Sequence, residues 1–121
     1  MATIKFYQYP KCSTCRKAQK FLDAANIDYK SIDITVDPPN KKELKTAAQQ
    51  YLAGNYKKLF NTSGQVYREM ALKDKLSSMN PEQMLSLLAS NGKLIKRPLL
   101  IGSDLSFVGF KEADWEDGLS D

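Results

Sequence analysis

The stretch YPKCSTCRKAQKFL, residues 9–22, contains both cysteines of the 121-residue chain. The segment before it, residues 3–7 (TIKFY), alternates and is rich in β-forming residues, so it predicts a strand that Pro10 closes. From residue 13 or 14 the pattern becomes helical, and one face is apolar: Ala18, Phe21, Leu22 and Ala25. Cys12 and Cys15 are therefore predicted at the corner where a strand ends and a helix begins.

The segments that follow predict a second strand and then a helical middle. Residues 28–34 (DYKSIDI) alternate again after Asn26, a plausible helix stop. A strand-helix-strand unit crosses over right-handed, so its two strands should be parallel. Asn40 is a candidate N-cap for a further helix. Short helical turns are expected beyond it, at residues 65–70 and 72–77.

The last third of the chain predicts one more strong helix and a hairpin. In NPEQMLSLLASNG, Asn80 is the expected N-cap, Pro81 opens the helix and Gly92 stops it. Residues 99–101 and 106–108 predict two strands joined by Gly-Ser-Asp as an antiparallel hairpin. A short closing helix should follow in KEADWEDGL, residues 111–119.

This order of elements predicts an α/β, thioredoxin-like fold. A mixed four-stranded sheet would join a βαβ half to a ββα half, with a helical insertion at about residues 40–90 between them. We expect residues 1–121 to form a single domain, because this length suits one core. The aromatic residues expected in the core are Phe6, Phe21, Phe60, Phe107 and Trp115.

Composition excludes several classes of protein. The formal net charge is +4, and the basic residues are scattered as pairs such as Lys41-Lys42, Lys57-Lys58 and Lys96-Arg97. Such pairs indicate a solvated surface rather than a nucleic-acid stripe. No apolar run approaches a membrane span, and the N-terminus has no secretory h-region. We therefore expect a cytoplasmic monomer that binds neither membrane nor nucleic acid directly and holds no stable structural disulfide.

The absence of histidine narrows the chemistry of the two cysteines. Without histidine there is no Cys-His nucleophile pair, and two cysteines cannot form a four-thiolate zinc site. No metal is therefore expected. A redox-active thiol pair remains, against the alternative that Cys15 is only a small buried core residue.

A cysteine at a helix start faces unpaired backbone N–H groups and the positive end of the helix dipole, which both favour thiolate. Cys12 is thus the predicted attacking thiol. Cys15, one turn further on, is at the right spacing to resolve a mixed disulfide. The residues expected to add positive potential or hydroxyl donors around Cys12 are Lys11, Ser13, Thr14 and Arg16.

The pair Arg97-Pro98 stands directly before a predicted strand. Thioredoxin-like domains place a cis-proline there, facing the active cysteine, so a cis bond at Pro98 is favoured over a trans one. Arg97 is one of only three arginines, with Arg16 and Arg68. Its forked guanidinium is predicted to hold a small oxyanion or to stabilise the Cys12 thiolate. Arg68 is expected to be mainly structural.

Four stretches together resemble the arsenate reductase/Spx family: YPKCSTCRKAQKFL, LFNTSGQVYREM, RPLLI and VGFKEADW. The resemblance covers nearly the whole chain. It implies a thioredoxin-like fold with a helical insertion, no cofactor, and thioredoxin or glutaredoxin as the thiol reductant. LFNTSGQVYRE is typical of the small arsenate-reductase-like proteins of low-GC Gram-positive bacteria.

The family divides by function, and the resemblance implies different roles. Glutaredoxin-linked arsenate reductases use one cysteine and three arginines; Cys12 and Arg97 match, but Asn61 and Gly109 stand where the other two arginines are expected. Spx-like regulators use CxxC as a redox switch and bind the RNA polymerase α-subunit, partly through a glycine that aligns near Gly54. We expect a thiol-disulfide oxidoreductase first, a redox-switch regulator second and an arsenate reductase third.

Overall fold

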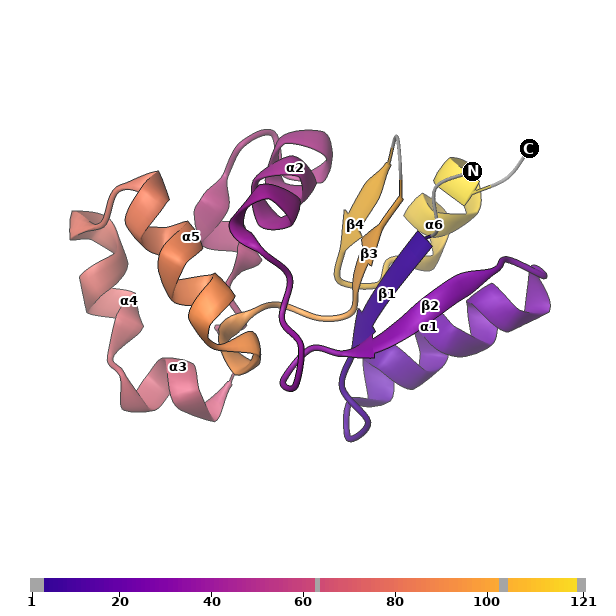
Figure 1. Cartoon of the computed structure of the whole chain (residues 1–121), viewed down its shortest axis with the longest axis horizontal. Coiled ribbons are helices and arrows are strands. Elements are labelled where there is room, and N and C mark those ends of the chain that lie inside the picture. The colour runs from indigo at the N-terminus through magenta and orange to yellow at the C-terminus, as the bar shows by residue number, and fades with distance from the viewer. Residues whose placement is uncertain (1–3, 63, 103–104, 120–121) are drawn as a thin grey trace.

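The computed structural model describes residues 4–62, 64–102 and 105–119 (Figure 1). This part of the chain contains four strands, six α-helices and three short 3-10 turns. In chain order they are β1 (Ile4–Gln8), α1 (Ser13–Ala24), β2 (Tyr29–Asp33), α2 (Lys41–Tyr51), η1 (Tyr56–Leu59), α3 (Gln65–Glu69), α4 (Leu72–Lys75), η2 (Leu76–Ser78), α5 (Pro81–Ser90), η3 (Gly92–Leu94), β3 (Leu99–Ile101), β4 (Ser106–Val108) and α6 (Glu112–Leu119).

The four strands form one mixed sheet in the order β2-β1-β3-β4. Strands β1 and β2 are parallel, with Phe6 opposite Ser31. Strand β3 is antiparallel to both β1 and β4, and Leu100 lies opposite Phe6 on one side and Phe107 on the other. The predicted α/β, thioredoxin-like arrangement is confirmed, including the parallel crossover and the antiparallel C-terminal pair.

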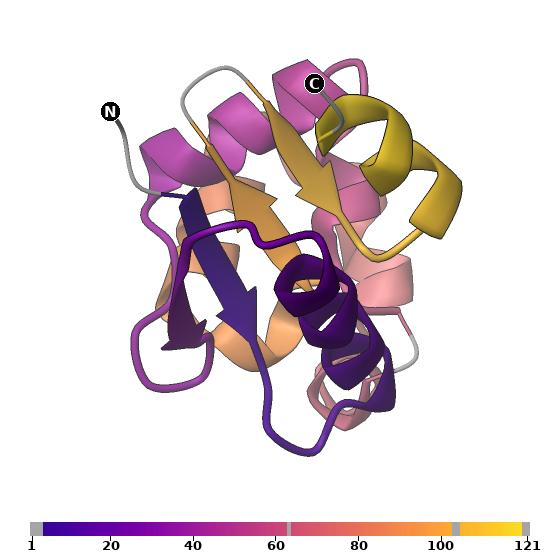
Figure 2. The same cartoon turned by 90° about the vertical axis from the view of Figure 1, so that its right-hand side faces the viewer.

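Helices cover both faces of the sheet. Figure 2 shows α1 and α6 in front of the strands and the helices between β2 and β3 behind them. On the α1 and α6 face, the buried side chains of Phe6, Leu100 and Phe107 pack with Trp115. On the other face, Tyr7, Leu99 and Val108 pack against the helical insertion. The alternation of each strand thus divides the core into two clusters separated by one sheet.

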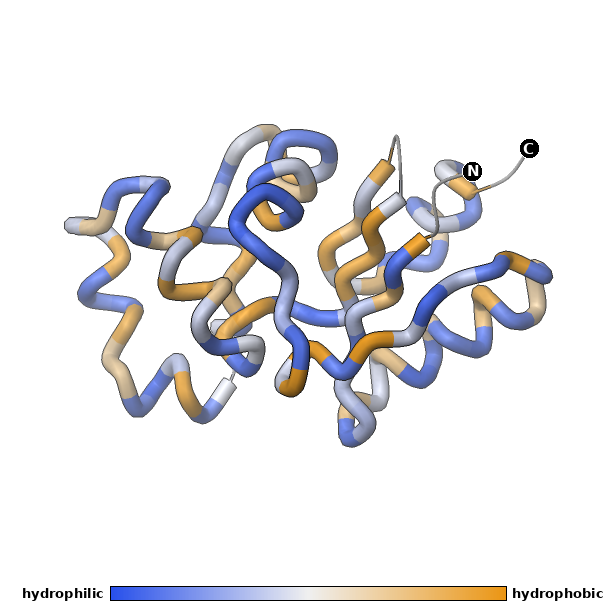
Figure 3. The backbone as a smooth tube through the Cα atoms, viewed as in Figure 1, coloured by the Kyte–Doolittle hydropathy of each residue, from blue (hydrophilic) through white to orange (hydrophobic). Residues whose placement is uncertain are grey.

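Sequence hydropathy follows this layering. In Figure 3 apolar stretches gather along β3 and β4, while polar and apolar residues alternate along α1. The residues of α1 that are buried, Cys15, Ala18 and Leu22, recur at the spacing of one helix face. Phe21, which the pattern also assigned to the core, is only partly buried at the edge of the α1 and α6 cluster.

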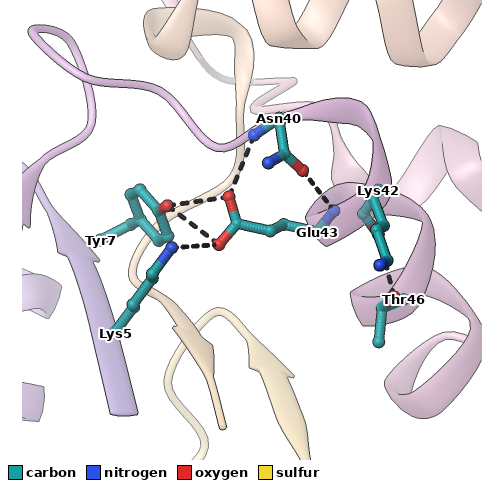
Figure 4. A network of polar contacts seen from close by, with 6 residues as sticks. All are labelled: Lys5, Tyr7, Asn40, Lys42, Glu43 and Thr46. Carbon is teal, nitrogen blue, oxygen red and sulfur yellow. Dashed lines mark hydrogen bonds and ion pairs between the residues drawn. The ribbon is translucent and has the colours of Figure 1, made fainter. Parts of the chain in front are cut away.

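A polar network joins the insertion to β1 (Figure 4). Glu43 of α2 accepts a hydrogen bond from Lys5 Nζ at 2.9 Å and from the Tyr7 hydroxyl at 3.1 Å. Asn40 caps α2 as predicted: its Oδ1 accepts from the Glu43 N–H, and a Glu43 carboxylate oxygen accepts from the Asn40 N–H. Thr46 Oγ1 donates to the Lys42 carbonyl within the same helix. The Glu43 carboxylate therefore caps the N-terminus of α2 and also connects this helix to β1 by hydrogen bonds.

Several boundaries differ from the predictions. Strand β2 covers Tyr29–Asp33, shorter by one residue at each end. The predicted stop of α1 at Asn26 is confirmed: the helix ends at Ala24, Ala25 is its C-cap, and Asn26 follows with a left-handed φ of +57° and an N–H that donates to the Asp23 carbonyl. Helix α5 ends at Ser90 with Asn91 as its C-cap, so Gly92 is the first residue after the cap, where the stop was predicted. A Cβ on Gly92 would lie 1.8 Å from the Ile34 carbonyl oxygen, so glycine is required there for close approach to the end of β2. Thr3, Ser103 and Asp104, included in the predicted first strand and hairpin, lie outside the described residues.

Candidate active site

Cys12 is the N-cap residue of α1, as the sequence predicts. Its N–H donates to the Tyr9 carbonyl at 2.9 Å, which closes the turn after β1. Its Sγ accepts a hydrogen bond from the Cys15 N–H at 3.2 Å. The sulfur thus takes the place of the serine or aspartate oxygen found at many helix starts. A negative charge on this sulfur would be stabilised by an N–H group that the helix leaves unpaired.

Cys15 lies one turn behind Cys12, and its side chain is 2% exposed. Burial raises the pKa of the Cys15 thiol to about 12, and a hydrogen bond with the Cys12 side chain acts in the same direction. A backbone hydrogen bond with Tyr9 and the charge of Arg97 act weakly in the opposite direction. Cys15 is therefore a protonated thiol at neutral pH. Both cysteines are free, so this is the reduced form of the pair.

Arg97 lies beside the two cysteines. The Arg97-Pro98 peptide bond is cis, as its position before β3 predicts. The guanidinium carbon is 4.7 Å from the centroid of the Tyr9 ring, a cation–π contact that orients the side chain. Its Nε and Nη1 are buried and have no hydrogen-bond partner among the residues that the structure describes. Buried N–H donors require acceptors, so this geometry suits an anion or thiolate held next to Cys12.

A pocket of about 570 Å³ opens at Cys12. Five of the predicted site residues line it together: Lys11, Cys12, Ser13, Thr14 and Arg97. Pro98 and Cys15 are buried and are not among the lining residues. Arg16 is exposed on α1 and is not among the lining residues. Its expected contribution of positive potential near Cys12 stays a prediction.

The opposite wall of the pocket comes from segments distant in sequence. It is formed by Asn61, Gly64, Lys96 and residues 108–111. Asn61 and Gly109, where the resemblance to arsenate reductases leads one to expect arginine, both line this pocket, and Arg97 is the sole arginine among the described lining residues. Gly109 has a φ of +78°, and its virtual Cβ would lie 3.2 Å from Lys96 Cε. The Lys96 stem therefore covers the space that a side chain at position 109 would need.

The wall segments are fixed by backbone hydrogen bonds. The Asn61 N–H donates to the Leu94 carbonyl, and the Lys96 N–H donates to the Leu59 carbonyl, both at 2.7 Å. The Gly109 N–H donates to the Pro98 carbonyl at 2.8 Å. The Gly109 carbonyl in turn accepts from the Trp115 indole N–H at 3.2 Å. Sequence reasoning did not assign Gly64, Lys96, Val108 or Phe110 to the site, because only these long-range contacts bring them to Cys12.

Within residues 4–62, 64–102 and 105–119, no group of three or more histidine, cysteine or acidic side chains could hold a metal ion. The helices in this same part of the chain are all too short or too polar to cross a membrane.

Comparison with known proteins gives consistent relatives. The ArsC family model matches residues 7–117. The uncharacterised protein YusI of Bacillus subtilis (strain 168) is 48% identical over 95% of this chain and 97% of its own length. A crystal structure of an ArsC-family-related protein from Bacteroides fragilis is 46% identical, covers 95% of this chain and 96% of its own, and superposes with a TM-score of 0.89. The global transcriptional regulator Spx of Enterococcus faecalis (strain ATCC 700802 / V583) is 28% identical over 90% of this chain and 80% of its own.

Proposed function

The chain belongs to the ArsC family, and from that premise we propose that it is a thiol-disulfide oxidoreductase in which Cys12 attacks and Cys15 resolves. The observation that carries this proposal is the reduced Cys12–Cys15 pair at the start of α1, where the Cys15 N–H donates to Cys12 Sγ. The Cys15 N–H is placed to donate to the sulfur that makes the attack, and the nucleophilic form of that sulfur is the thiolate.

In the first step, the Cys12 thiolate attacks one sulfur of a substrate disulfide. A bond forms between Cys12 and that sulfur, the substrate S–S bond breaks, and the second sulfur leaves as a thiolate. The leaving thiolate takes a proton from solvent. Arg97 supports this step, because its buried Nε and Nη1 lie in the same pocket as Cys12 and can donate hydrogen bonds to the negatively charged attacking or leaving sulfur.

In the second step, the Cys15 thiol loses its proton to solvent and attacks Cys12 Sγ. The mixed disulfide breaks, the substrate sulfur leaves, and the Cys12–Cys15 disulfide forms. Two electrons have then passed from the protein to the substrate. A dithiol of the thioredoxin or glutaredoxin class, acting in the cytoplasm, would restore the reduced pair, and no cofactor enters the cycle.

The test is to trap the intermediate with single-cysteine variants. The reduced protein, Cys12→Ser and Cys15→Ser are mixed with a model disulfide and analysed by mass spectrometry after alkylation. We expect an intramolecular disulfide in the unaltered protein, an accumulating mixed disulfide on Cys12 in Cys15→Ser, and neither in Cys12→Ser. If no Cys12–Cys15 disulfide forms under any oxidising condition, Cys15 is only a core residue and the proposal is wrong.

The likeness to Spx supports a second candidate, a redox-switch regulator that acts through RNA polymerase. The two candidates share the CxxC pair and differ in turnover. Supplying thioredoxin and glutaredoxin in turn distinguishes them: an oxidoreductase reduces many equivalents of substrate, whereas a switch forms its disulfide once without turnover. Arsenate reduction is the third candidate and the least favoured, because Asn61 and Gly109 leave the pocket with one arginine fork instead of three.

A further inference from the structure

We propose that the physiological substrate is an acidic polypeptide segment, which lies along a lysine-lined groove that continues from the Cys12 pocket. This inference rests on the proposed oxidoreductase function and names its substrate class. It starts from a second cavity of about 370 Å³, which is lined by Lys57, Lys58, Lys96 and Lys111.

The second cavity adjoins the Cys12 pocket. The two share Lys96, Val108 and Lys111 as lining residues, so they lie side by side and together make up the proposed groove. Its walls are the segments already shown to be fixed by backbone hydrogen bonds: residues 59–61 against 94–96, and Gly109 against Pro98. The groove is therefore a built feature of the fold rather than a chance meeting of surface side chains.

The charged side chains that line this groove are all positive. Lys11, Lys96, Arg97 and Lys111 line the first cavity, and Lys57 and Lys58 extend the row into the second. None of the described lining residues of either cavity is Asp or Glu. Nor does any of these six cations form an ion pair with the residues that the structure describes, whose two salt bridges are Lys5–Glu43 and Lys41–Glu82. Unpaired cations along a groove attract an anionic partner and accelerate its association.

The chemistry of the second cavity favours a polypeptide over a small anion. Leu52, Phe60 and Val108 give it an apolar floor beneath the lysines. An oxyanion or a short thiol compound would fit within the first cavity and leave the apolar residues of the second cavity uncovered. A peptide can place its cysteine at Cys12 and then present acidic and apolar side chains in turn along the groove.

The test uses two synthetic peptides whose single cysteine is joined to 2-nitro-5-thiobenzoate as a mixed disulfide. One has Glu and Leu flanking the cysteine, and its partner has Gln in place of each Glu. Cys12 attacks the peptide sulfur, the peptide–thiobenzoate bond breaks, and coloured thiobenzoate leaves. Cys15 then displaces the peptide thiol. The reduced protein supplies both electrons, so no other reductant is needed.

We expect the acidic peptide to react about tenfold faster than the neutral one, with the ratio falling as salt rises from about 0.05 to 0.5 M. In Lys57→Gln/Lys58→Gln this acidic-to-neutral ratio should fall about three- to tenfold. Lys73→Gln/Lys75→Gln, in exposed α4 positions that line neither cavity, is the matched control and should keep the ratio. Equal rates for the two peptides, or an equal loss in both double variants, would overturn the inference.

A binding measurement separates this inference from the proposed chemistry. Fluorescence anisotropy of a labelled, cysteine-free acidic peptide with Cys12→Ser needs no thiol reaction, and we expect binding that Lys57→Gln/Lys58→Gln weakens. If this binding is found but no thiobenzoate is released from either peptide, the oxidoreductase function fails. If both peptides react equally and the labelled peptide does not bind, the groove proposal fails alone. The groove proposal would also be overturned if a single-stranded oligonucleotide displaced the labelled peptide as well as the unlabelled acidic peptide does, because the groove would then bind any polyanion.

Discussion

At the scale of single residues, the two cysteines of one motif are in different environments. Cys12 is partly exposed at a helix start, and Cys15 is buried one turn behind it. The spacing of the motif predicts the order of the two thiols along the helix. The degree to which Cys15 is shielded depends on the packing around it, which the motif does not contain.

The first prediction concerns the pH dependence of the resolving step. Burial, the largest cause of the raised Cys15 pKa of about 12, persists in the mixed disulfide. Only the thiolate attacks, and its population below that pKa rises about tenfold per pH unit. The rate of Cys12–Cys15 disulfide formation from a preformed mixed disulfide should therefore rise about tenfold per unit between roughly pH 7 and 9. Stopped-flow release of a chromogenic thiol measures this rate. A rate that does not change with pH would contradict the burial of the Cys15 thiol.

The second prediction concerns the guanidinium fork of Arg97. In Arg97→Lys the positive charge remains, but the Nε and Nη1 donors that are buried beside Cys12 are lost. The rate of the first thiol exchange should fall roughly tenfold, because an ammonium cannot reproduce the fork. The substrate is a neutral disulfide such as bis(2-hydroxyethyl) disulfide. Arg68→Lys makes the same change at an exposed position of α3 and should have no effect, whereas equal effects in both variants would contradict a local role.

At the scale of elements, two of the contacts that join the insertion to the sheet can each be tested by a single change. One is the Glu43 network between α2 and β1, and the other is the approach of Gly92 to the end of β2. Between these points the helices pack on the sheet through apolar side chains. Each point offers a single change that loosens the insertion without touching the cysteines.

The third prediction is that Gly92→Ala destabilises the protein. The new Cβ would lie 1.8 Å from the Ile34 carbonyl oxygen, which is backbone and cannot swing aside. We expect a loss of about 2–3 kcal/mol in the free energy of unfolding by urea denaturation, as for other overpacked sites. Gly102→Ala is the control, because its Cβ would meet its nearest neighbour at 3.5 Å. A similar loss at both positions would show that the close approach does not matter.

The fourth prediction follows from Glu43. Its burial opposes ionisation, but hydrogen bonds from Lys5, the Asn40 N–H and Tyr7 outweigh burial and hold the pKa of Glu43 below its usual value. A lowered carboxyl pKa stabilises the fold above the unfolded pKa of about 4.3, and this stabilisation is lost as pH falls through the folded pKa.

Glu43→Gln should therefore lower the free energy of unfolding by about 1 kcal/mol at neutral pH. The difference from the unaltered protein should shrink as pH falls from about 4.3 through the lowered folded pKa of Glu43, below which both side chains are neutral. Glu82→Gln, which breaks the exposed pair with Lys41, is the matched control and should show a smaller change. A Glu43→Gln difference that is constant from pH 7 to about pH 3 would contradict an ionised Glu43 in the network.

At the scale of the whole molecule, local patterns predict most of the fold. Strand alternation, the Asn40 and Asn80 caps and the Pro81 helix start reflect contacts within a few residues, and the structure contains all of them. The cis bond at Pro98 was predicted from its place in the resembled fold. The close approach of Gly92 to the end of β2, more than fifty positions away in the chain, leaves no local pattern and could not be predicted.

The candidate site likewise has one wall that the local sequence predicts and one that it does not. Its first wall, residues 11–14, is one continuous stretch and could be read directly from the sequence. Its second wall depends on the pairing of Phe60 with Ile95 and on the turn at Gly109, neither of which leaves a local pattern. The pairs Lys57-Lys58 and Lys96-Arg97 look like ordinary solvated surface in the sequence. Only the folded chain brings them to two adjoining cavities.

The position of Trp115 has an optical consequence. It is the single tryptophan of the chain, it is fully buried, and its indole N–H donates to the carbonyl of Gly109 in the pocket wall. Its emission should therefore be blue-shifted in the resting protein, and a ligand that displaces the Gly109 turn would alter the dipole bonded to the fluorophore. The chain thus carries an intrinsic spectroscopic probe of its own pocket, and occupancy could be followed by emission without attaching a dye.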